Sequence, residues 1–332
     1  MIGLLKTKLF RAAVLLVLLI MAAVVTAGCT SDSQNTDSLP EQITVVEDEK
    51  ADTETETEQD ASKRMEITVF DVGKADAILI TTENHTVLLD TGENKHGDEI
   101  AKNILNRGIT EIDYLIITHF HKDHVGGAAK IIKRIPIKNV VVPDYGKESK
   151  HYDRFIEAMG ETGIESVILR ETIELVIDGA KLTVYPTSQE YYFFRANDED
   201  DTENEDEGDE SAQSIPQENN FSIAVSVNHG NNNFLFTGDA KSKRLKELLL
   251  TEDIASTEYD FLKVPHHGRY NKRSQEFIYT IFPKYAVITC SLDNPADKRV
   301  VAALENIGAQ VFSTASGDVF CISDGETIKV HQ

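Results

Sequence analysis

Residues 118–127 read Thr-His-Phe-His-Lys-Asp-His-Val-Gly-Gly, and this stretch decides how the rest of the chain is interpreted. Four side chains that can bind a metal fall within it, namely His119, His121, Asp123 and His124. Imidazole and carboxylate groups are the ligands expected for zinc, manganese or iron. The stretch therefore predicts a metal site.

The segments on either side of this stretch indicate how the ligands are presented. The apolar run 114–117 reads as a buried strand, so the residues after it can point out of a sheet into a shared pocket. Side chains two apart in a strand share a face, which lets His119 and His121 converge on one ion. The chain then turns, and Asp123 and His124 can reach a second ion. A solvated loop of four polar residues is the alternative, but the preceding strand and the Gly126–Gly127 pair argue against it. The first hypothesis is a metal-dependent hydrolase.

The N-terminus has the pattern of an export signal. Basic residues at positions 6, 8 and 11 precede an apolar stretch, 12–25, which is short for a membrane span of about 20 residues. The small residues before Cys29 make segment 1–28 resemble a bacterial lipoprotein signal, in which Leu usually stands where Thr26 does. This resemblance implies that Cys29 is lipidated and holds the chain to the cell membrane on its extracellular face. An ordinary signal peptide and an uncleaved anchor remain alternatives.

Charge and composition divide the 332 residues further. Segment 29–62 is rich in Ser, Thr, Asp and Glu, so we expect a disordered acidic tether. A second acidic run, 196–213, is expected to be a solvated surface insertion. These two segments carry most of the net charge of −23. The remaining domain, 63–332, is only mildly acidic, and its charge therefore does not exclude an anionic substrate.

The expected elements of the folded part suggest one large α/β domain or a close pair of halves. Strands are expected at 65–71, 77–81, 86–90, 113–118, 138–143, 166–169, 173–177, 181–185, 221–228, 233–237, 259–264 and 285–290, with two more closing the chain. Helices are expected at 98–106, 125–134, 152–159, 241–250, 275–281 and 298–307. In each half a cluster of strands precedes alternating helices and strands. This order fits two mixed β-sheets packed together with helices on the outer faces.

Two cysteines other than Cys29 lie in strand-like runs, Cys290 and Cys321. Two buried free thiols are the expected state, because Cys in such runs behaves as a small apolar residue. A disulfide remains the alternative in an extracellular setting.

The metal stretch resembles a known signature, His-x-His-x-Asp-His-x-Gly-Gly of the metallo-β-lactamase fold. Further segments resemble the ComEC-type competence proteins within that family, in the same order: Phe70-Asp71-Val72-Gly73-Lys74-Ala75-Asp76-Ala77, Leu89-Asp90-Thr91-Gly92, Asn219-Asn220-Phe221-Ser222, Phe236-Thr237-Gly238-Asp239 and Leu262-Lys263-Val264-Pro265-His266-His267-Gly268. The resemblance covers nearly the whole folded part. It implies an αββα sandwich that belongs to the α/β (α+β) class and carries two divalent metal ions, with Zn²⁺ expected and Mn²⁺ as the alternative.

The resemblance also implies a role for each matching residue. His119 and His121 would hold one metal ion, while Asp123 and His124 would hold the other. Asp239 would bridge the two ions. His267 would complete the ligand set of the second ion, and His266 would face the substrate to stabilise charge or protonate the leaving group. Asp90 and Asn220 would support the ligands. The opposite assignment of His266 and His267 remains open.

The chain departs from the pattern of these relatives in several places. A third His for the first ion is missing between 124 and 239, and Asn219 and Asn220 occupy that neighbourhood. His229 is a candidate by residue type, but we expect it at the exposed tip of a hairpin. Three further departures are Lys74-Ala75 where Gln-Gly is usual, Arg269 where Ser is usual, and Pro295-Ala296-Asp297 where His-Pro-Ser is often found. Arg269 would suit a phosphate group, with a surface salt bridge as the alternative.

The function implied is hydrolysis. A pair of metal ions lowers the pKa of water and supplies hydroxide near neutral pH, for attack on phosphorus or a carbonyl carbon, and Asp123 would accept a proton. The leading hypothesis is a phosphodiesterase or nuclease-like enzyme at the cell surface, acting on DNA or on a phosphorylated envelope polymer. The alternatives are a lactonase or β-lactamase, an enzyme similar to phosphorylcholine esterases, and a binding lipoprotein with little catalysis. No obligate protein partner is evident.

Overall fold

The computed structural model describes residues 64–188 and 218–332, which all belong to one compact unit spanning Gln59–Gln332. The predicted signal (1–28), the lipidated Cys29, the tether (29–62) and the acidic insertion (196–213) lie outside the described residues. Among the helices that are described, none is both long and apolar enough to cross a membrane.

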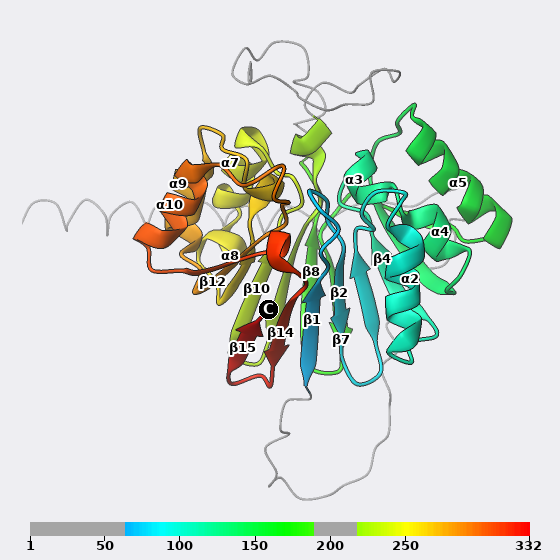
Figure 1. Ribbon diagram of the computed structural model, residues 1–332, viewed down its shortest axis with the longest axis horizontal. Helices are drawn as coiled ribbons and strands as arrows, with labels where there is room; N and C mark the ends of the chain where they lie inside the picture. Colours follow the sequence, from blue (N-terminus) through cyan, green and yellow to red (C-terminus); the bar gives the residue numbers. More distant parts are fainter. Residues whose placement is uncertain (1–63, 189–217) are drawn as a thin grey trace, which may run out of the picture. The chain divides into compact units, whose positions relative to one another are not determined.

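Two β-sheets form the centre of the fold (Figure 1). The first has eight strands in the order β15-β14-β1-β2-β3-β4-β5-β6. Its strands are β1 (Met65–Val69), β2 (Ile78–Thr81), β3 (Thr86–Leu89), β4 (Ile112–Ile116), β5 (Ile137–Pro143), β6 (Ser166–Leu169), β14 (Val319–Ser323) and β15 (Ile328–His331). Strands β3 to β6 run parallel, whereas the pairs from β15 to β3 are antiparallel, so the sheet is mixed.

The second sheet has seven strands in the order β13-β12-β11-β10-β9-β8-β7 and is also mixed. Its strands are β7 (Ile173–Ile177), β8 (Ala180–Tyr185), β9 (Ala224–His229), β10 (Asn232–Phe236), β11 (Phe261–Lys263), β12 (Tyr285–Ile288) and β13 (Gln310–Ser313). Strands β10 to β13 are parallel, and β7 to β10 are joined as antiparallel pairs.

A continuous apolar core lies between the sheets. In β1, Met65, Ile67 and Val69 alternate onto this inner face, because side chains in a strand point to opposite sides in turn. Phe234 and Phe261 of the second sheet reach the same core, with ring centroids 5.9 Å apart. Burial of these side chains is the main free-energy gain that holds the sheets together.

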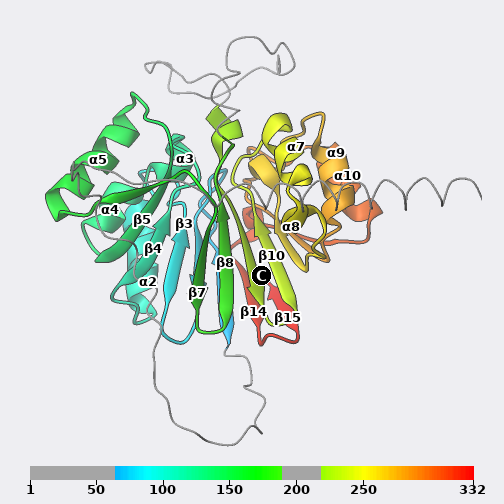
Figure 2. The same ribbon diagram turned by 180° about the vertical axis from the view of Figure 1, so that it is seen from behind.

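Helices cover the outer face of each sheet, as Figures 1 and 2 show from opposite sides. The first sheet is covered by α2 (Gly97–Asn106), α4 (Ala128–Ile132) and α5 (Lys150–Thr162). The second sheet is covered by α7 (Ser242–Leu250), α8 (Glu252–Ala255), α9 (Ser274–Ile281) and α10 (Lys298–Asn306). The predicted αββα sandwich is therefore confirmed.

The helix predicted at 125–134 is two helices, α3 (Lys122–Val125) and α4 (Ala128–Ile132). The Gly126–Gly127 pair separates them because the backbone passes very close to its neighbours there. A Cβ atom on Gly127 would lie 2.2 Å from the carbonyl oxygen of Thr91, and one on Gly97 would lie 2.5 Å from the carbonyl oxygen of Gly127. The glycines therefore allow the segment after β3 to pack against the metal stretch.

Four other predictions about the fold need comment. His229 is buried rather than exposed, and its Nδ1 lies 2.8 Å from the Ser323 hydroxyl of β14, so the prediction of a surface His was wrong. Three strands close the chain instead of two. The strand predicted at 221–228 begins later, at Ala224, because Phe221 ends a short 3-10 helix, η2 (Glu218–Phe221). Cys290 and Cys321 are buried free thiols, as predicted.

Replacement of Gly127 tests this close approach. We expect Gly127→Ala to lower the free energy of unfolding by about 1–3 kcal/mol, since the added methyl group must displace backbone. Gly160→Ala is the matched control: Gly160 is exposed in α5 with nothing within 4 Å of an added Cβ. This control should raise the free energy of unfolding by up to about 1 kcal/mol. Urea unfolding measures both values, and equal effects would contradict the packing described.

Candidate metal centre

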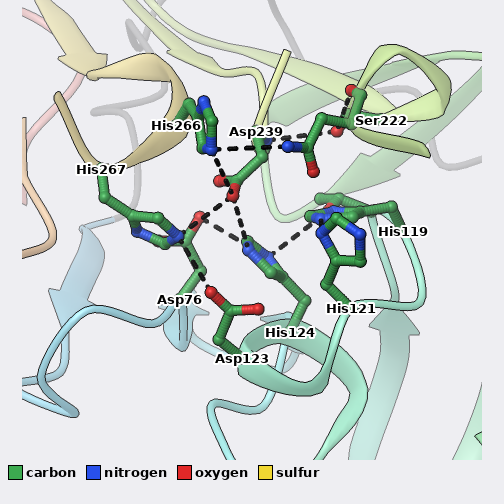
Figure 3. A network of polar contacts seen from close by, with 12 residues as sticks. Asp76, His119, His121, Asp123, His124, Ser222, Asp239, His266 and His267 are labelled. Atoms are coloured by element: carbon green, nitrogen blue, oxygen red, sulfur yellow. Dashed lines mark hydrogen bonds and ion pairs between the residues drawn. The ribbon is translucent and has the colours of Figure 1, made fainter. Parts of the chain in front are cut away.

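The segments that carry the predicted ligands all follow parallel strands and meet at one edge of the two sheets. Asp90 follows β3, the metal stretch follows β4, Asp239 follows β10, and the 266–267 pair follows β11. Carboxyl ends of parallel strands gather at the same edge, which is where open α/β sheets usually bind ligands. The close view in Figure 3 shows that the side chains of the metal stretch, Asp239 and the 266–267 pair converge on one region.

Four of these residues form a tight group, Asp123, His124, Asp239 and His267, whose donor atoms all lie within 4.8 Å of one another. Asp239 Oδ2 is 3.2 Å from His124 Nε2 and 3.1 Å from His267 Nε2. Asp123 Oδ2 is 3.4 Å from His267 Nε2. The group combines two residues of the first sheet's loops with two of the second sheet's loops.

Several atoms of this group lack the partners that buried polar atoms normally have. His124 Nε2, His267 Nε2 and Asp239 Oδ1 are buried without a hydrogen-bond partner. Orphaned polar atoms are costly in a protein interior, and three that belong to one group need a common explanation. A divalent cation would satisfy all three. Imidazole and carboxylate donors suit zinc or manganese, so the residues present fit the expected metal.

Asp90 contacts this group through polar contacts with Thr118 and His124. Its backbone adopts φ 57°, and its carboxylate turns back to accept hydrogen bonds from the Thr118 backbone N–H at 2.8 Å and the Thr118 hydroxyl at 2.7 Å. Its Oδ2 also lies 2.8 Å from His124 Nδ1. A carboxylate on the outer nitrogen of a ligating His fixes the tautomer and the orientation of the ring. This geometry suits the orienting role predicted for Asp90.

The metal group contacts a buried ion pair that the sequence reasoning missed, Lys263 with Asp76. Both side chains are almost fully buried. Lys263 Nζ also donates to the Gly238 carbonyl oxygen at 3.0 Å and lies 3.6 Å from Asp239 Oδ1. Asp76 Oδ1 accepts from the Thr289 hydroxyl at 2.6 Å. The pair therefore fixes the turn that presents Asp239, and a lysine inside the apolar strand β11 was the sequence signal.

His119 and His121 are adjacent to the four-residue group but lie outside it. His119 Nε2 and His121 Nδ1 face each other at 3.1 Å, so one ion could contact both. Burial, with the nearby His124 and His121, keeps the pKa of His119 well below its usual value. A neutral imidazole is the form that binds metal.

Glu218 of η2 is a second residue that the sequence reasoning missed. Its Oε2 lies 3.1 Å from His121 Nε2, on the side of the ring away from His119. Lys147 Nζ at 2.6 Å and the Tyr145 hydroxyl at 2.9 Å hold the Glu218 carboxylate in place. The same Tyr145 hydroxyl accepts from the backbone N–H of Phe120, which ties Glu218 to the metal stretch. This is the carboxylate–histidine arrangement that orients metal ligands.

Asn219 and Asn220 occupy the neighbourhood of the missing third His. Asn219 Oδ1 is buried without a hydrogen-bond partner, and its Nδ2 lies 3.4 Å from His266 Nε2. Asn220 is fully buried, and its Oδ1 accepts from the Arg244 backbone N–H at 3.1 Å. Asn219 is therefore the one of the two with an oxygen available to a ligand, while Asn220 holds the start of α7.

The adjacent His266 and His267 have different surroundings. Both adopt left-handed backbone conformations, with φ 49° and 52°, and their ring centroids lie 6.2 Å apart. His267 is buried in the group, whereas His266 Nε2 lies 3.9 Å from Asp239 Oδ2. The side chain of His266 is 12% exposed. Burial lowers the pKa of His266 to about 3, so this ring is neutral at pH 7.

Contacts within the group set the protonation states of Asp123 and His267. Burial alone would raise the pKa of Asp123 and lower that of His267. The contact with His267 outweighs burial and holds the pKa of Asp123 well below its usual value. The carboxylates of Asp239 and Asp76 likewise raise the pKa of His267 to about 10. Carboxylates in this group are therefore ionised, and a metal ion would replace the proton on His267.

Comparison with known families places this site in context. Residues 70–291 match the model of the metallo-β-lactamase superfamily, which is two thirds of the chain. The chain belongs to this superfamily, whose members are generally hydrolases.

Individual relatives define the branch. The chain is 25% identical over 251 residues to ComE operon protein 3 of Bacillus subtilis, covering 70% of this chain and 29% of that protein. It is 25% identical over 237 residues to Recombination protein 2 of Haemophilus influenzae, covering 69% of this chain and 25% of that protein. The chain thus spans less than a third of either relative, and its homologues are ComEC-like competence proteins. Among solved structures, it resembles the metallo-β-lactamase fold protein YhfI of Bacillus subtilis, with a TM-score of 0.49 and 11% identity over 81% of this chain and 100% of that one.

Replacement of Glu218 tests its role behind His121. We expect Glu218→Ala to weaken the binding of one metal ion by about 10- to 100-fold, because His121 loses the partner that orients its ring. Glu218→Gln keeps an acceptor and should lose less. Metal content after dialysis, measured by plasma mass spectrometry, would show two ions per wild-type chain and a fall towards one in Glu218→Ala. Unchanged content and affinity in Glu218→Ala would contradict this assignment.

Proposed function

We propose that the chain is a metal-dependent phosphodiesterase. The observation that carries this proposal is the pair of adjacent donor sets, His119 with His121 and the group around Asp239, because two neighbouring divalent ions suit the displacement of a phosphate ester. The names of the relatives support it, since recombination and competence both concern DNA. Fold alone does not fix the substrate, so the proposal depends on the site.

The residues of the site would have separate roles in phosphodiester hydrolysis. When bound, the metal ions would polarise the phosphoryl oxygens and lower the pKa of water. Asp123, ionised in the group, would accept a proton from the attacking water. His266, neutral and partly exposed beside Asp239, would hydrogen-bond a phosphoryl or leaving-group oxygen. Its low pKa favours this role over that of a cationic acid. Asp90, Asp76 and Glu218 would keep the ligand rings in place.

The substrate would be DNA or a phosphorylated envelope polymer, both of which contain phosphodiesters. A lactonase or β-lactamase activity, a phosphorylcholine esterase-like activity and a purely binding role remain alternatives on the same fold. In the described part of the chain, no further histidine joins the four-residue group, and Asn219 next to His266 has a buried oxygen without a hydrogen-bond partner.

Hydrolysis of a simple diester tests this proposal. We expect the full chain loaded with Zn²⁺ or Mn²⁺ to cleave bis-p-nitrophenyl phosphate. Asp239→Asn should lower kcat/KM by more than about a hundredfold, since losing a ligand costs more than losing a supporting residue. Asp253→Asn, which removes an exposed charge on α8, is the control. Turnover of nitrocefin or a lactone without any diester cleavage would overturn the proposal.

The location of the enzyme belongs to the same proposal. The apolar stretch 12–25 and the small residues before Cys29 support a lipid anchor on the outer face of a bacterial membrane. We expect cells that express the chain to incorporate labelled palmitate into it, and Cys29→Ala to abolish the label. Label that persists in Cys29→Ala would contradict the anchor.

A further inference from the structure

A cavity of about 370 Å³ opens beside the metal group and reaches His267. Its lining includes the cations Lys74 and Arg269, the carboxylates Asp293 and Asp297, and the rings of His267 and Tyr270. The lining residues come from three separate parts of the chain: the turn between β1 and β2, the segment after β11, and the loop before α10. Its size suits a phosphate together with part of the group that carries it.

The cavity brings together residues that are far apart in the sequence. Lys74, Arg269 and Asp297 all contribute to its lining next to His267. Two of these side chains, Lys74 and Arg269, carry a positive charge. They would therefore act together on whatever binds beside the metal group.

The loop before α10 forms one wall of the cavity and is fixed by several contacts. The Asp297 backbone N–H donates to the Gly268 carbonyl oxygen at 2.9 Å, and a Cβ on Gly268 would lie 2.7 Å from the Ala296 Cβ. Asp297 also accepts two hydrogen bonds from the Arg299 guanidinium, at 2.7 and 3.0 Å. That guanidinium lies 3.6 Å from the centre of the Tyr270 ring. The negative charge of Asp297 is thus offset by Arg299, whereas Asp293, the other carboxylate of the lining, is exposed to solvent. The same contacts attach the loop to the segment that carries His267.

We propose that Lys74 and Arg269 form an anion subsite beside the metal group, so that the preferred substrate carries a second phosphate next to the ester that is cleaved. This proposal rests on the phosphodiesterase function proposed above and names the feature that the substrate must contain. Arg binds phosphate through a fork of N–H donors, and Lys adds a mobile point charge. Both residues are partly exposed, which allows a substrate to reach them. The subsite would favour chains of repeating phosphodiesters over isolated ones.

Two matched pairs of substrates test the subsite. The first pair is the p-nitrophenyl ester of thymidine 5′-phosphate, with and without a 3′-phosphate. The second pair is the p-nitrophenyl ester of glycerol 1-phosphate, with and without a 3-phosphate. We expect the second phosphate to raise kcat/KM by about tenfold or more in the wild-type chain, as one charge-assisted hydrogen bond would. A gain in both pairs assigns the subsite to phosphate from any backbone, and a gain in the thymidine pair alone assigns it to nucleotides.

Variants connect this gain to the two residues. Lys74→Gln combined with Arg269→Ser removes both positive charges from the cavity and should reduce the gain to near one. Lys74→Arg, which keeps the charge, should retain most of it. Lys272→Gln is the matched control, because this exposed lysine lies close in sequence to Arg269 but does not line the cavity. An equal loss on both members of a pair, or a gain that survives in the double variant, would overturn the proposal.

If the wild-type chain cleaves none of these esters, the proposed function fails, but a direct binding measurement still tests the subsite. Calorimetric titration of the metal-loaded full chain with thymidine 3′,5′-bisphosphate should then show an affinity about tenfold or more above that of the double variant. Equal affinities would overturn the subsite.

Discussion

The carboxylate of Asp239 is the contact on which the rest of the site depends. It follows β10 in the second sheet, yet its Oδ2 lies 3.2 Å from His124 Nε2, which belongs to the loops of the first sheet. His267, from the second sheet, approaches the same oxygen at 3.1 Å. Buried polar atoms from the two sheets come this close because the sheets pack face to face. Residues such as Asp90 and Lys263 hold the loops in place. The apolar core therefore positions the metal group, and the metal group requires that packing.

Local sequence was sufficient to predict most of the fold. Apolar runs such as 112–116 and 285–288 became strands because their side chains fill the two faces of a sheet. The errors arose where contacts between distant segments decide the structure. The helix predicted at 125–134 divides because Gly127 packs against Thr91, and His229 is buried because β14 brings Ser323 to it. Neither neighbour can be identified from the sequence around these residues.

The same distinction applies to the site. The ligands in 118–127 could be predicted because their spacing alone suits a metal ion. Asp76, Glu218 and Lys263 were not predicted as part of the site, because their roles depend on partners that are remote in sequence. Asp76 and Lys263 nevertheless left a sign, since a charged residue within or beside an apolar strand needs a buried partner. The cavity beside His267 could not be predicted either, because Lys74, Arg269 and Asp297 come together there only in the folded chain.

Anomalous X-ray scattering from crystals of the metal-loaded chain would test the central claim most directly. The account predicts one ion bound by Asp123, His124, Asp239 and His267, and a neighbouring ion bound by His119 and His121 that shares Asp239. A metal ion held elsewhere in the chain, or a loaded crystal in which Asp239 and His267 bind no ion, would contradict it.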